Sequence, residues 1–282
     1  MKQEQAVDAH VRYRAADGVA TVTIDRPHVM NAIAGWSGGT RDQIVAAIEE
    51  AEGDASVGCV VLTGSGANFC GGGDLTGNTV RETAAEHRAF LESADAFHAR
   101  IRGSAVPVIA AVQGYCLGAG LTLVSSCDVV IASEDARFGF PEGRLGLVGA
   151  STLVSVVGRQ WAKFLIMTGE LVDAALAQRL GIVLAVEPPG ELDARAHDLA
   201  ARISRMPREA VRRNRATIDA AADAAGASAE RRAALDGDTQ TLVAASSAEA
   251  PDGRRFRDVI RDEGMSGMKA ARAQQYQSPW LR

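Results

Sequence analysis

Three glycine-rich segments and one glutamate are the parts of this sequence best suited to chemistry. Residues 60–75 read VVLTGSGANFCGGGDL, residues 110–121 read AAVQGYCLGAGL, and residues 138–146 read FGFPEGRLG. The first two segments begin with a short apolar run that is typical of a strand. Glycine after a strand lets the backbone approach a ligand closely, with N–H groups pointing inward. In the third segment, Glu142 adds a carboxylate that could move a proton.

A nucleotide-binding loop is the first alternative for these glycines. A dinucleotide site needs G-x-G-x-x-G between a strand and a helix, but Phe69 and Leu123 stand where the third glycine is required. A P-loop needs Gly-Lys followed by Ser or Thr, and the sequence contains no such run. Both kinds of nucleotide site are therefore disfavoured.

An oxyanion hole is the second explanation. Two glycine turns that face each other would direct backbone N–H groups at one oxygen atom. Such a pair stabilises the enolate that forms when a proton leaves the carbon next to a thioester carbonyl. Tight turns in a compact fold, with no chemical role, are the alternative for the same residues.

The order of these segments resembles the crotonase superfamily, the enoyl-CoA hydratases and isomerases, across nearly the whole chain. Residues 24–27 (IDRP) with 31–32 (NA) are similar to its early strand-and-turn signature, and residues 69–75 to its F-C/S-A-G-x-D-L segment. Residues 113–128 resemble its N-G-x-x-x-G-G-G…C-D segment, residues 138–146 its F-x-x-P-E-x-x-x-G segment, and residues 263–265 (EGM) its late E-G-M. Each similarity is weak alone, but five in the same order are specific.

The resemblance implies roles for four residues. The backbone N–H groups of Gly73 and Ala119 would hold the thioester oxygen, and Glu142 would be the acid/base residue. Ala119 stands where many members have glycine, which should not matter because only its N–H is used. The second glutamate of the true hydratases falls on Thr122.

Thr122 decides which reaction is expected. Two carboxylates make the addition of water to a conjugated thioester easiest, because one orients the water while the other transfers the α-proton. A threonine hydroxyl can hold water but is a poor base. Hydration is the family's commonest activity. A single carboxylate also suits a Δ3,Δ2-enoyl-CoA isomerase or a CoA-dependent hydratase-lyase, and an inactive acyl-CoA-binding homologue is a further alternative.

Coenzyme A is implied as part of the substrate, and we predict no separate cofactor and no metal site. In the family its adenine end lies along the early turn and the loop at residues 64–72. Arg26 is the candidate for a contact with CoA, and the same role is predicted for the loop residues Gly71, Gly72, Asp74 and Leu75. Acceptance of backbone hydrogen bonds is the simpler role for Asp74 and Asp128. His87 and His98 could reach the pocket, although core or surface roles are the simpler explanation.

Alternating strand and helix signals surround the glycine segments and predict an α/β fold with largely parallel pairing. Strands are predicted at residues 20–24, 57–63, 107–112, 129–132 and 182–186. Helices are predicted at residues 40–53, with Thr40 and Gln43 as a capping box, at 81–102, and after the cap Asp173. By the resemblance, residues 1–205 form a crotonase-type spiral of ββα units that carries the acyl-CoA site.

The last part of the chain, residues 206–282, is rich in Ala, Arg, Glu and Asp and has no strand signal. We predict a helical region broken near Gly226, Gly237 and residues 246–253. Its apolar faces are patchy, so it is expected to pack against another subunit. The resemblance implies a trimerisation region, and therefore a homotrimer or homohexamer.

Composition limits the remaining classes. The 282 residues carry a formal net charge of −5, which gives no electrostatic preference for nucleic acid or anionic lipid. The four cysteines lack metal-ligand spacing and are expected in the core of a protein from a reducing compartment. No apolar stretch is long and uninterrupted enough to span a membrane. We therefore expect a cytoplasmic protein without membrane or nucleic-acid partners.

Overall fold

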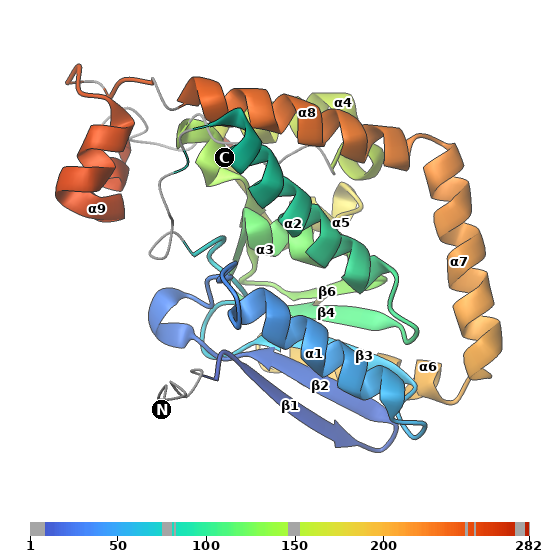
Figure 1. Cartoon of the computed structure of the whole chain (residues 1–282). Coiled ribbons are helices and arrows are strands. Elements are labelled where there is room, and N and C mark those ends of the chain that lie inside the picture. Colours follow the sequence, from blue (N-terminus) through green and yellow to red (C-terminus); the bar gives the residue numbers. More distant parts are fainter. Residues whose placement is uncertain are drawn as a thin grey trace, which may run out of the picture.

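The computed structural model describes residues 9–74, 81, 83–145, 153–245, 248–250, 252–273 and 280–281. Its main sheet has the strand order β1-β2-β3-β4-β6-β9 (Figure 1). β1 pairs with β2 in antiparallel fashion, and all the other pairs in this sheet are parallel. The strands are β1 Val11–Ala16, β2 Val19–Ile24, β3 Cys59–Gly64, β4 Val108–Val112, β6 Val129–Ser133 and β9 Ala185–Glu187.

The continuous apolar run in β3 has a direct structural reason. Val60 and Leu62 face one core cluster, whereas Cys59 and Val61 face a second cluster on the other side of the sheet. A strand covered on both faces needs apolar side chains at every position rather than at alternate ones. The strand predicted at residues 57–63 is therefore confirmed as β3, and it is buried on both faces.

Helices supply the two covers of the main sheet. α1 packs against β1 and β2 on one face, and α6 packs against β2, β3, β4 and β6 on the other. The α/β class predicted from the sequence is thus confirmed. The helices of this part of the chain are α1 Thr40–Gly53, α2 Ala84–Arg102, α3 Ala119–Val124, α4 Val154–Thr168, α5 Ala174–Arg179 and α6 Leu192–Ser204.

A second, smaller sheet contains parts of the second and third glycine-rich segments. It consists of β5 Tyr115–Leu117, β7 Arg137–Gly139 and β8 Leu171–Asp173, in the order β5-β7-β8. The chain passes from β4 directly into β5 and from β6 into β7, so successive units place one strand in each sheet. Parallel bridges between Ile33 and Gly73, and between Cys70 and Cys116, repeat this arrangement in the earlier turns. Such repetition is what a spiral of ββα units requires.

The capping box predicted at α1 is wrong. Gly39 is the N-cap, Thr40 Oγ1 accepts the Ala34 N–H at 3.1 Å, and Gln43 Oε1 accepts the His10 N–H at 2.7 Å. These side chains tie α1 to more distant backbone instead of to its own first turn.

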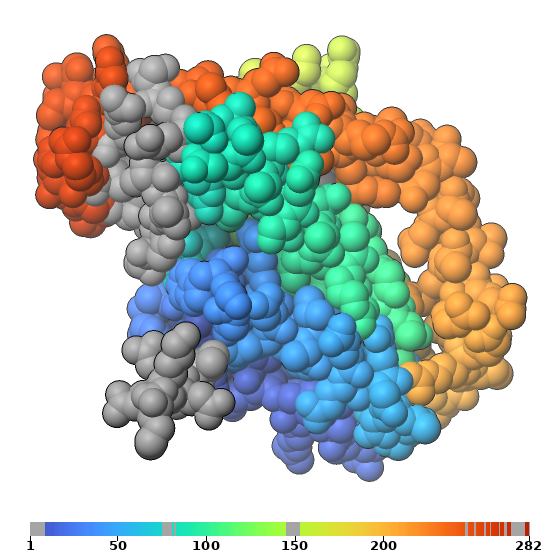
Figure 2. All heavy atoms as spheres, viewed as in Figure 1, coloured from blue at the N-terminus to red at the C-terminus, as the bar shows by residue number. Residues whose placement is uncertain are grey.

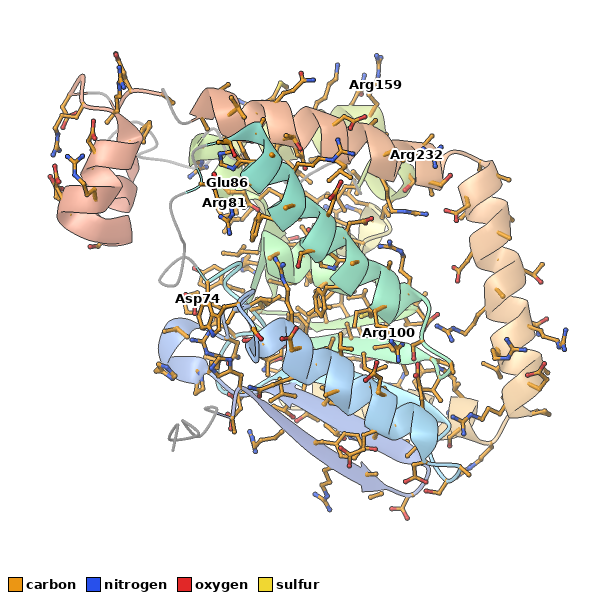
Figure 3. The ribbon with its side chains drawn as sticks, in the orientation of Figure 1. Asp74, Arg81, Glu86, Arg100, Arg159 and Arg232 are labelled. Atoms are coloured by element: carbon orange, nitrogen blue, oxygen red, sulfur yellow. The ribbon has the colours of Figure 1, made fainter. Side chains whose placement is uncertain are left out.

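A true capping box begins α2. Thr83 Oγ1 accepts the Glu86 N–H at 3.2 Å, and Glu86 Oε2 accepts the Thr83 N–H at 2.9 Å. Figure 3 shows Glu86 and Arg81 beside this end of α2, with Arg100 near the other end. The predicted cap of α5 is confirmed, since Asp173 Oδ1 accepts the Leu176 N–H at 2.7 Å.

The C-terminal helices leave the core and return to it. α7 Arg208–Ala224 has no buried residue, α8 Ala227–Ala245 packs along α2, and α9 Phe256–Ala273 follows. Figure 2 shows openings between α7 and the core. The break at Gly226 is confirmed, but Gly237 lies inside α8, so the break predicted there is wrong. The division into domains at residue 205 stays a prediction.

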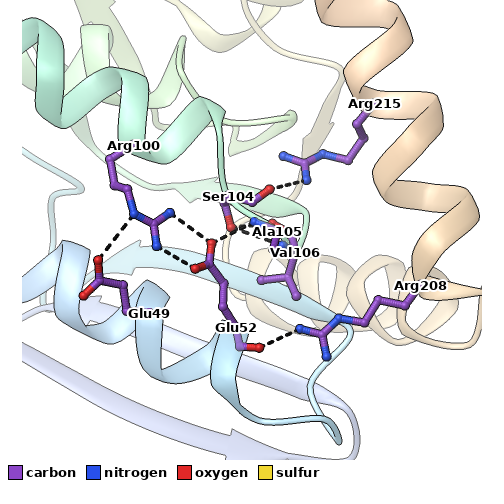
Figure 4. Close-up of polar contacts among 8 residues, drawn as sticks. All are labelled: Glu49, Glu52, Arg100, Ser104, Ala105, Val106, Arg208 and Arg215. Carbon is purple, nitrogen blue, oxygen red and sulfur yellow. Dashed lines mark hydrogen bonds and ion pairs between the residues drawn. The ribbon is translucent and has the colours of Figure 1, made fainter.

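Two arginines of α7 connect this helix to the core by hydrogen bonds (Figure 4). Arg208 Nη2 donates to the Glu52 carbonyl at 2.9 Å, and Arg215 Nη1 donates to the Ser104 carbonyl at 2.7 Å. The Glu52 carboxylate accepts hydrogen bonds from both terminal nitrogens of Arg100 and from the Ala105 N–H. α7 is therefore held against the core by a few polar contacts and not by buried apolar side chains of its own. No helix in the described ranges is long and apolar enough to cross a membrane.

Candidate active site

The two glycine turns meet as the oxyanion hypothesis requires. A Cβ built on Gly73 would lie 4.0 Å from the Cβ of Ala119, so the two backbones face each other closely. Ile33 holds the first turn, because it donates to the Gly72 carbonyl and accepts from the Asp74 N–H, each at 2.9 Å. Within the described part of the chain, neither the Gly73 N–H nor the Ala119 N–H has a hydrogen-bond acceptor. Two free donors thus stand side by side.

Two glycines adopt backbone conformations that other residues rarely do. Gly72 has φ +116° and Gly118 has φ +51°, and each immediately precedes one of the two donors. The buried Cys70 supports the first turn, because its Sγ accepts the Gly72 N–H at 3.4 Å. It also packs against the second, since a Cβ on Gly120 would lie 2.7 Å from the Cys70 Cβ.

Glu142 reaches the same place from a third element, the 3-10 helix η2 (Pro141–Leu145). A Cβ on Gly118 would lie only 2.5 Å from Glu142 Oε1, so the carboxylate lies directly against the residue before Ala119. Phe138 and Phe140, just before η2, are fully buried. Burial raises the pKa of Glu142 to about 7, which poises the group as both proton donor and acceptor near neutrality.

Contacts with the end of α4 hold η2 in position. Arg144 Nε donates to the Thr168 carbonyl at 2.7 Å, and Arg144 Nη2 pairs with Glu170 Oε1 at 3.0 Å. A Cβ on Gly143 would overlap the Ile166 carbonyl, so only glycine permits this close packing. Sequence reasoning did not identify Arg144 as a positioning residue. The one feature of the sequence that pointed to Arg144 was its place two residues after the candidate acid Glu142.

Thr122 approaches the site from α3. Its Oγ1 donates to the Gly118 carbonyl at 3.3 Å, and its backbone N–H donates to the same oxygen at 3.0 Å. Thr122 and Glu142 therefore touch the same glycine from two different elements. The hydroxyl makes this long internal bond, and it cannot act as a second carboxylate.

Arg26 is buried and already paired. Its Nη1 donates to Asp74 Oδ2 at 2.6 Å and to the Ala32 carbonyl at 2.7 Å, with 10% and 3% of the Arg26 and Asp74 side chains exposed. This ion pair fixes the residue that follows Gly73. A direct contact between Arg26 and CoA stays a prediction, as do those of Gly71, Gly72 and Asp74. Leu75 lies outside the described residues.

The remaining polar candidates have structural contacts. Asp128 Oδ2 accepts the Val108 N–H at 2.7 Å, as expected, and Oδ1 pairs with Arg215 at 2.6 Å. The Asp74 carboxylate accepts from the Arg26 side chain, and its predicted acceptance of backbone hydrogen bonds stays a prediction. His98 is buried in α2, and burial lowers its pKa to about 3, so its ring is neutral at physiological pH. All four cysteines are free thiols.

Comparison with known proteins identifies the family. The enoyl-CoA hydratase/isomerase family model matches residues 14–252. A probable enoyl-CoA hydratase of Mycobacterium bovis is 34% identical over 214 residues, covering 72% of this chain and 78% of that protein. A short-chain-enoyl-CoA hydratase of Clostridium acetobutylicum is 38% identical over 190 residues, covering 66% and 71%.

Solved structures agree. An enoyl-CoA hydratase/isomerase from Xanthobacter autotrophicus Py2 matches with a TM-score of 0.86 at 31% sequence identity, covering 96% of this chain and 99% of that one. The crotonase-type fold expected from the sequence is thereby confirmed. With two facing backbone donors and a carboxylate of raised pKa at one point, the chain belongs to the enoyl-CoA hydratase/isomerase family.

Proposed function

We propose that the protein is an enoyl-CoA hydratase-type enzyme that acts on an acyl-CoA thioester through an enolate. One observation carries the proposal: the Glu142 carboxylate lies against Gly118, beside the facing N–H groups of Gly73 and Ala119. A thioester oxygen held by these donors would bring its α-carbon next to the carboxylate. The names of the relatives in the same family support this class of reaction.

The proton balance works with a single carboxyl group. As the oxygen of a water molecule adds to C3 of the 2-enoyl thioester, protonated Glu142 gives its proton to C2. The negative charge that develops on the thioester oxygen is held by Gly73 and Ala119. The carboxylate takes the proton that the water loses and returns to its starting state. Thr122 Oγ1 would orient that water.

Isomerisation of a 3-enoyl-CoA is the second candidate, favoured because residue 122 is a threonine and not a second carboxylate. Ionised Glu142 would take a proton from C2 and return it at C4, and the double bond would move into conjugation. This path needs no water, so the lack of a second carboxylate costs nothing. A hydratase-lyase acting on an activated substrate would use the same single group.

Ultraviolet absorbance of the conjugated thioester separates the candidates. Loss of absorbance from a 2-enoyl-CoA supports hydration, whereas a gain from a 3-enoyl-CoA alone supports isomerisation. Glu142→Gln should abolish either activity, with Glu134→Gln, an exposed residue, as the matched control. If Glu142→Gln binds acyl-CoA and behaves like wild type, the protein is a non-catalytic binder and the proposed function fails.

We also propose that the C-terminal helices mediate a homotrimer or a homohexamer. Ile218 on α7 is 67% exposed and Val243 on α8 is 41% exposed. α7 buries none of its residues in its own subunit. Contact with a second copy would cover these apolar side chains. Sedimentation velocity tests this proposal, and a monomer at micromolar concentration would contradict it.

A further inference from the structure

Arg41, in the first turn of α1, is a buried cation without a hydrogen-bonded acceptor. Only 9% of Arg41 is exposed, and its Nη1 atom is buried without a hydrogen-bond partner. Among the described residues, no carboxylate forms an ion pair with it. An unpaired buried guanidinium is costly, so folded proteins normally provide it with an anion.

The surroundings of Arg41 are apolar or positive. The Arg41 guanidinium lies 5.3 Å from the centre of the Phe90 ring, and the Arg81 guanidinium lies 3.8 Å from the same ring. Burial, and then the charge of Arg81, lowers the pKa of Arg41. The neighbouring carboxylate of Asp42 is turned to the Gly38 N–H, which it accepts at 2.7 Å. Two cations thus share one aromatic ring.

His98 adds a second unsatisfied group nearby. Its Nδ1 is buried without a hydrogen-bond partner, and the charge of Arg41 contributes to lowering its pKa. A neutral imidazole can donate a hydrogen bond from either ring nitrogen. In the described ranges, then, both buried side-chain nitrogens left without a partner belong to this one cluster of Arg41, Arg81, Phe90 and His98.

The cluster lies close to the oxyanion turn. Ile33, which brackets Gly73, is followed two residues later by Gly35, and a Cβ on Gly35 would lie 3.2 Å from the Arg41 Nη1. Two residues span at most roughly 7 Å. α2, which carries Phe90 and His98, packs against both α1 and α3. One short segment and one helix therefore join this cluster to the oxyanion turn, and we expect an acyl chain that starts at the thioester to extend toward it.

We propose that Arg41, assisted by Arg81, binds a carboxylate at the far end of the acyl chain, so that the substrate is the CoA monothioester of a dicarboxylic acid. The inference rests on the proposed acyl-CoA function. A planar guanidinium matches a carboxylate with two parallel hydrogen bonds. The phosphates of CoA are the other anions available, but they lie beyond the long pantetheine arm, whereas Arg41 lies near the thioester site.

Binding of unreactive saturated thioesters tests the proposal by calorimetry. Wild type should bind adipyl-CoA about tenfold or more tightly than hexanoyl-CoA, the worth of a charged hydrogen bond. Arg41→Gln should remove this preference and leave the affinities for hexanoyl-CoA and free CoA unchanged. Arg41→Lys, which keeps the charge without the fork, should retain a weaker preference. Arg213→Gln, an exposed residue of α7, is the matched control.

Three results would overturn the inference, and a fourth would overturn the function on which it rests. Equal wild-type affinity for adipyl-CoA and hexanoyl-CoA, confirmed with the shorter glutaryl-CoA and pentanoyl-CoA pair, would exclude carboxylate recognition. Loss of free CoA binding in Arg41→Gln would assign Arg41 to a phosphate. Equal weakening of both acyl thioesters in that variant, with CoA unaffected, would make Arg41 merely structural. Failure of the wild type to bind hexanoyl-CoA and adipyl-CoA alike would instead overturn the proposed function itself.

Discussion

Replacing Glu142 with glutamine should stabilise the folded protein at alkaline pH and have little effect in acid. Burial raises the pKa of this carboxyl from 4.5 to about 7 in the folded state. Between those two pH values the folded state holds the proton more tightly than the unfolded state. The free energy of unfolding of the wild type should therefore fall as the pH rises through this interval.

The size of the effect follows from the same two values. Each pKa unit corresponds to ~1.4 kcal/mol, so burying the ionised carboxylate costs about 3 kcal/mol at pH 8. Glu142→Gln carries no charge and avoids this cost. The variant should be more stable than wild type by up to that amount at pH 8 and similar to it near pH 4. Other groups titrate in both proteins and cancel in the difference.

Urea unfolding at several pH values between 4 and 8 measures the difference directly. Glu134→Gln, at an exposed position, should show no such pH dependence. A constant difference between Glu142→Gln and wild type across this range would refute the reasoning, because the carboxyl would then titrate normally in the folded state. A variant less stable than wild type at pH 8 would show that lost hydrogen bonds outweigh the desolvation of the charge.

Three further predictions concern the reaction itself. For 2-enoyl-CoA hydration, kcat/KM should fall about tenfold per pH unit above about 7, because protonated Glu142 is required. For isomerisation, which requires ionised Glu142, kcat/KM should rise toward that pH and then level off. Profiles of kcat/KM against pH with both substrates check the two slopes. Thr122→Val should lower hydration roughly tenfold and leave isomerisation unchanged, as steady-state rates with each substrate would show. Arg144→Met should lower kcat roughly tenfold without weakening CoA binding, because Glu142 loses its anchor, and Arg144→Lys should recover part of the rate.

The main sheet could be predicted because its strands carry strong local signals. The doubly covered β3 is apolar at nearly every position, and β2 alternates between more and less buried residues. β1 escaped prediction, since most of this edge strand is exposed and its apolar alternation covers only Val11 and Tyr13. The strands of the second sheet have only three residues each, too few to show any period. Their pairing depends on contacts distant in sequence.

The structure brings the predicted residues Gly73, Ala119 and Glu142 together, but the geometry that does so could not be predicted. The glycine segments suggested two facing turns, and the resemblance to the family then implied Gly73, Ala119 and Glu142. The close approach of Glu142 to Gly118 depends on Arg144, which contacts a carbonyl 24 residues away. No local pattern specifies such a contact. Arg41 escaped notice because its turn of α1 was expected only to begin a helix.

Gly118 is the point at which the backbone turn, Thr122 and Glu142 meet. Its positive φ sets the turn before Ala119, its carbonyl receives Thr122, and its missing side chain leaves room for Glu142. α3 packs closely on the first turn through Gly120, where a Cβ would meet three atoms of Cys70. Replacement of a glutamate by threonine at position 122 would therefore leave both oxyanion donors and the acid/base residue in place. Under the proposed function, the choice between adding water and moving a double bond would then depend on the side chain at 122, while the enolate chemistry common to both would depend on the backbone.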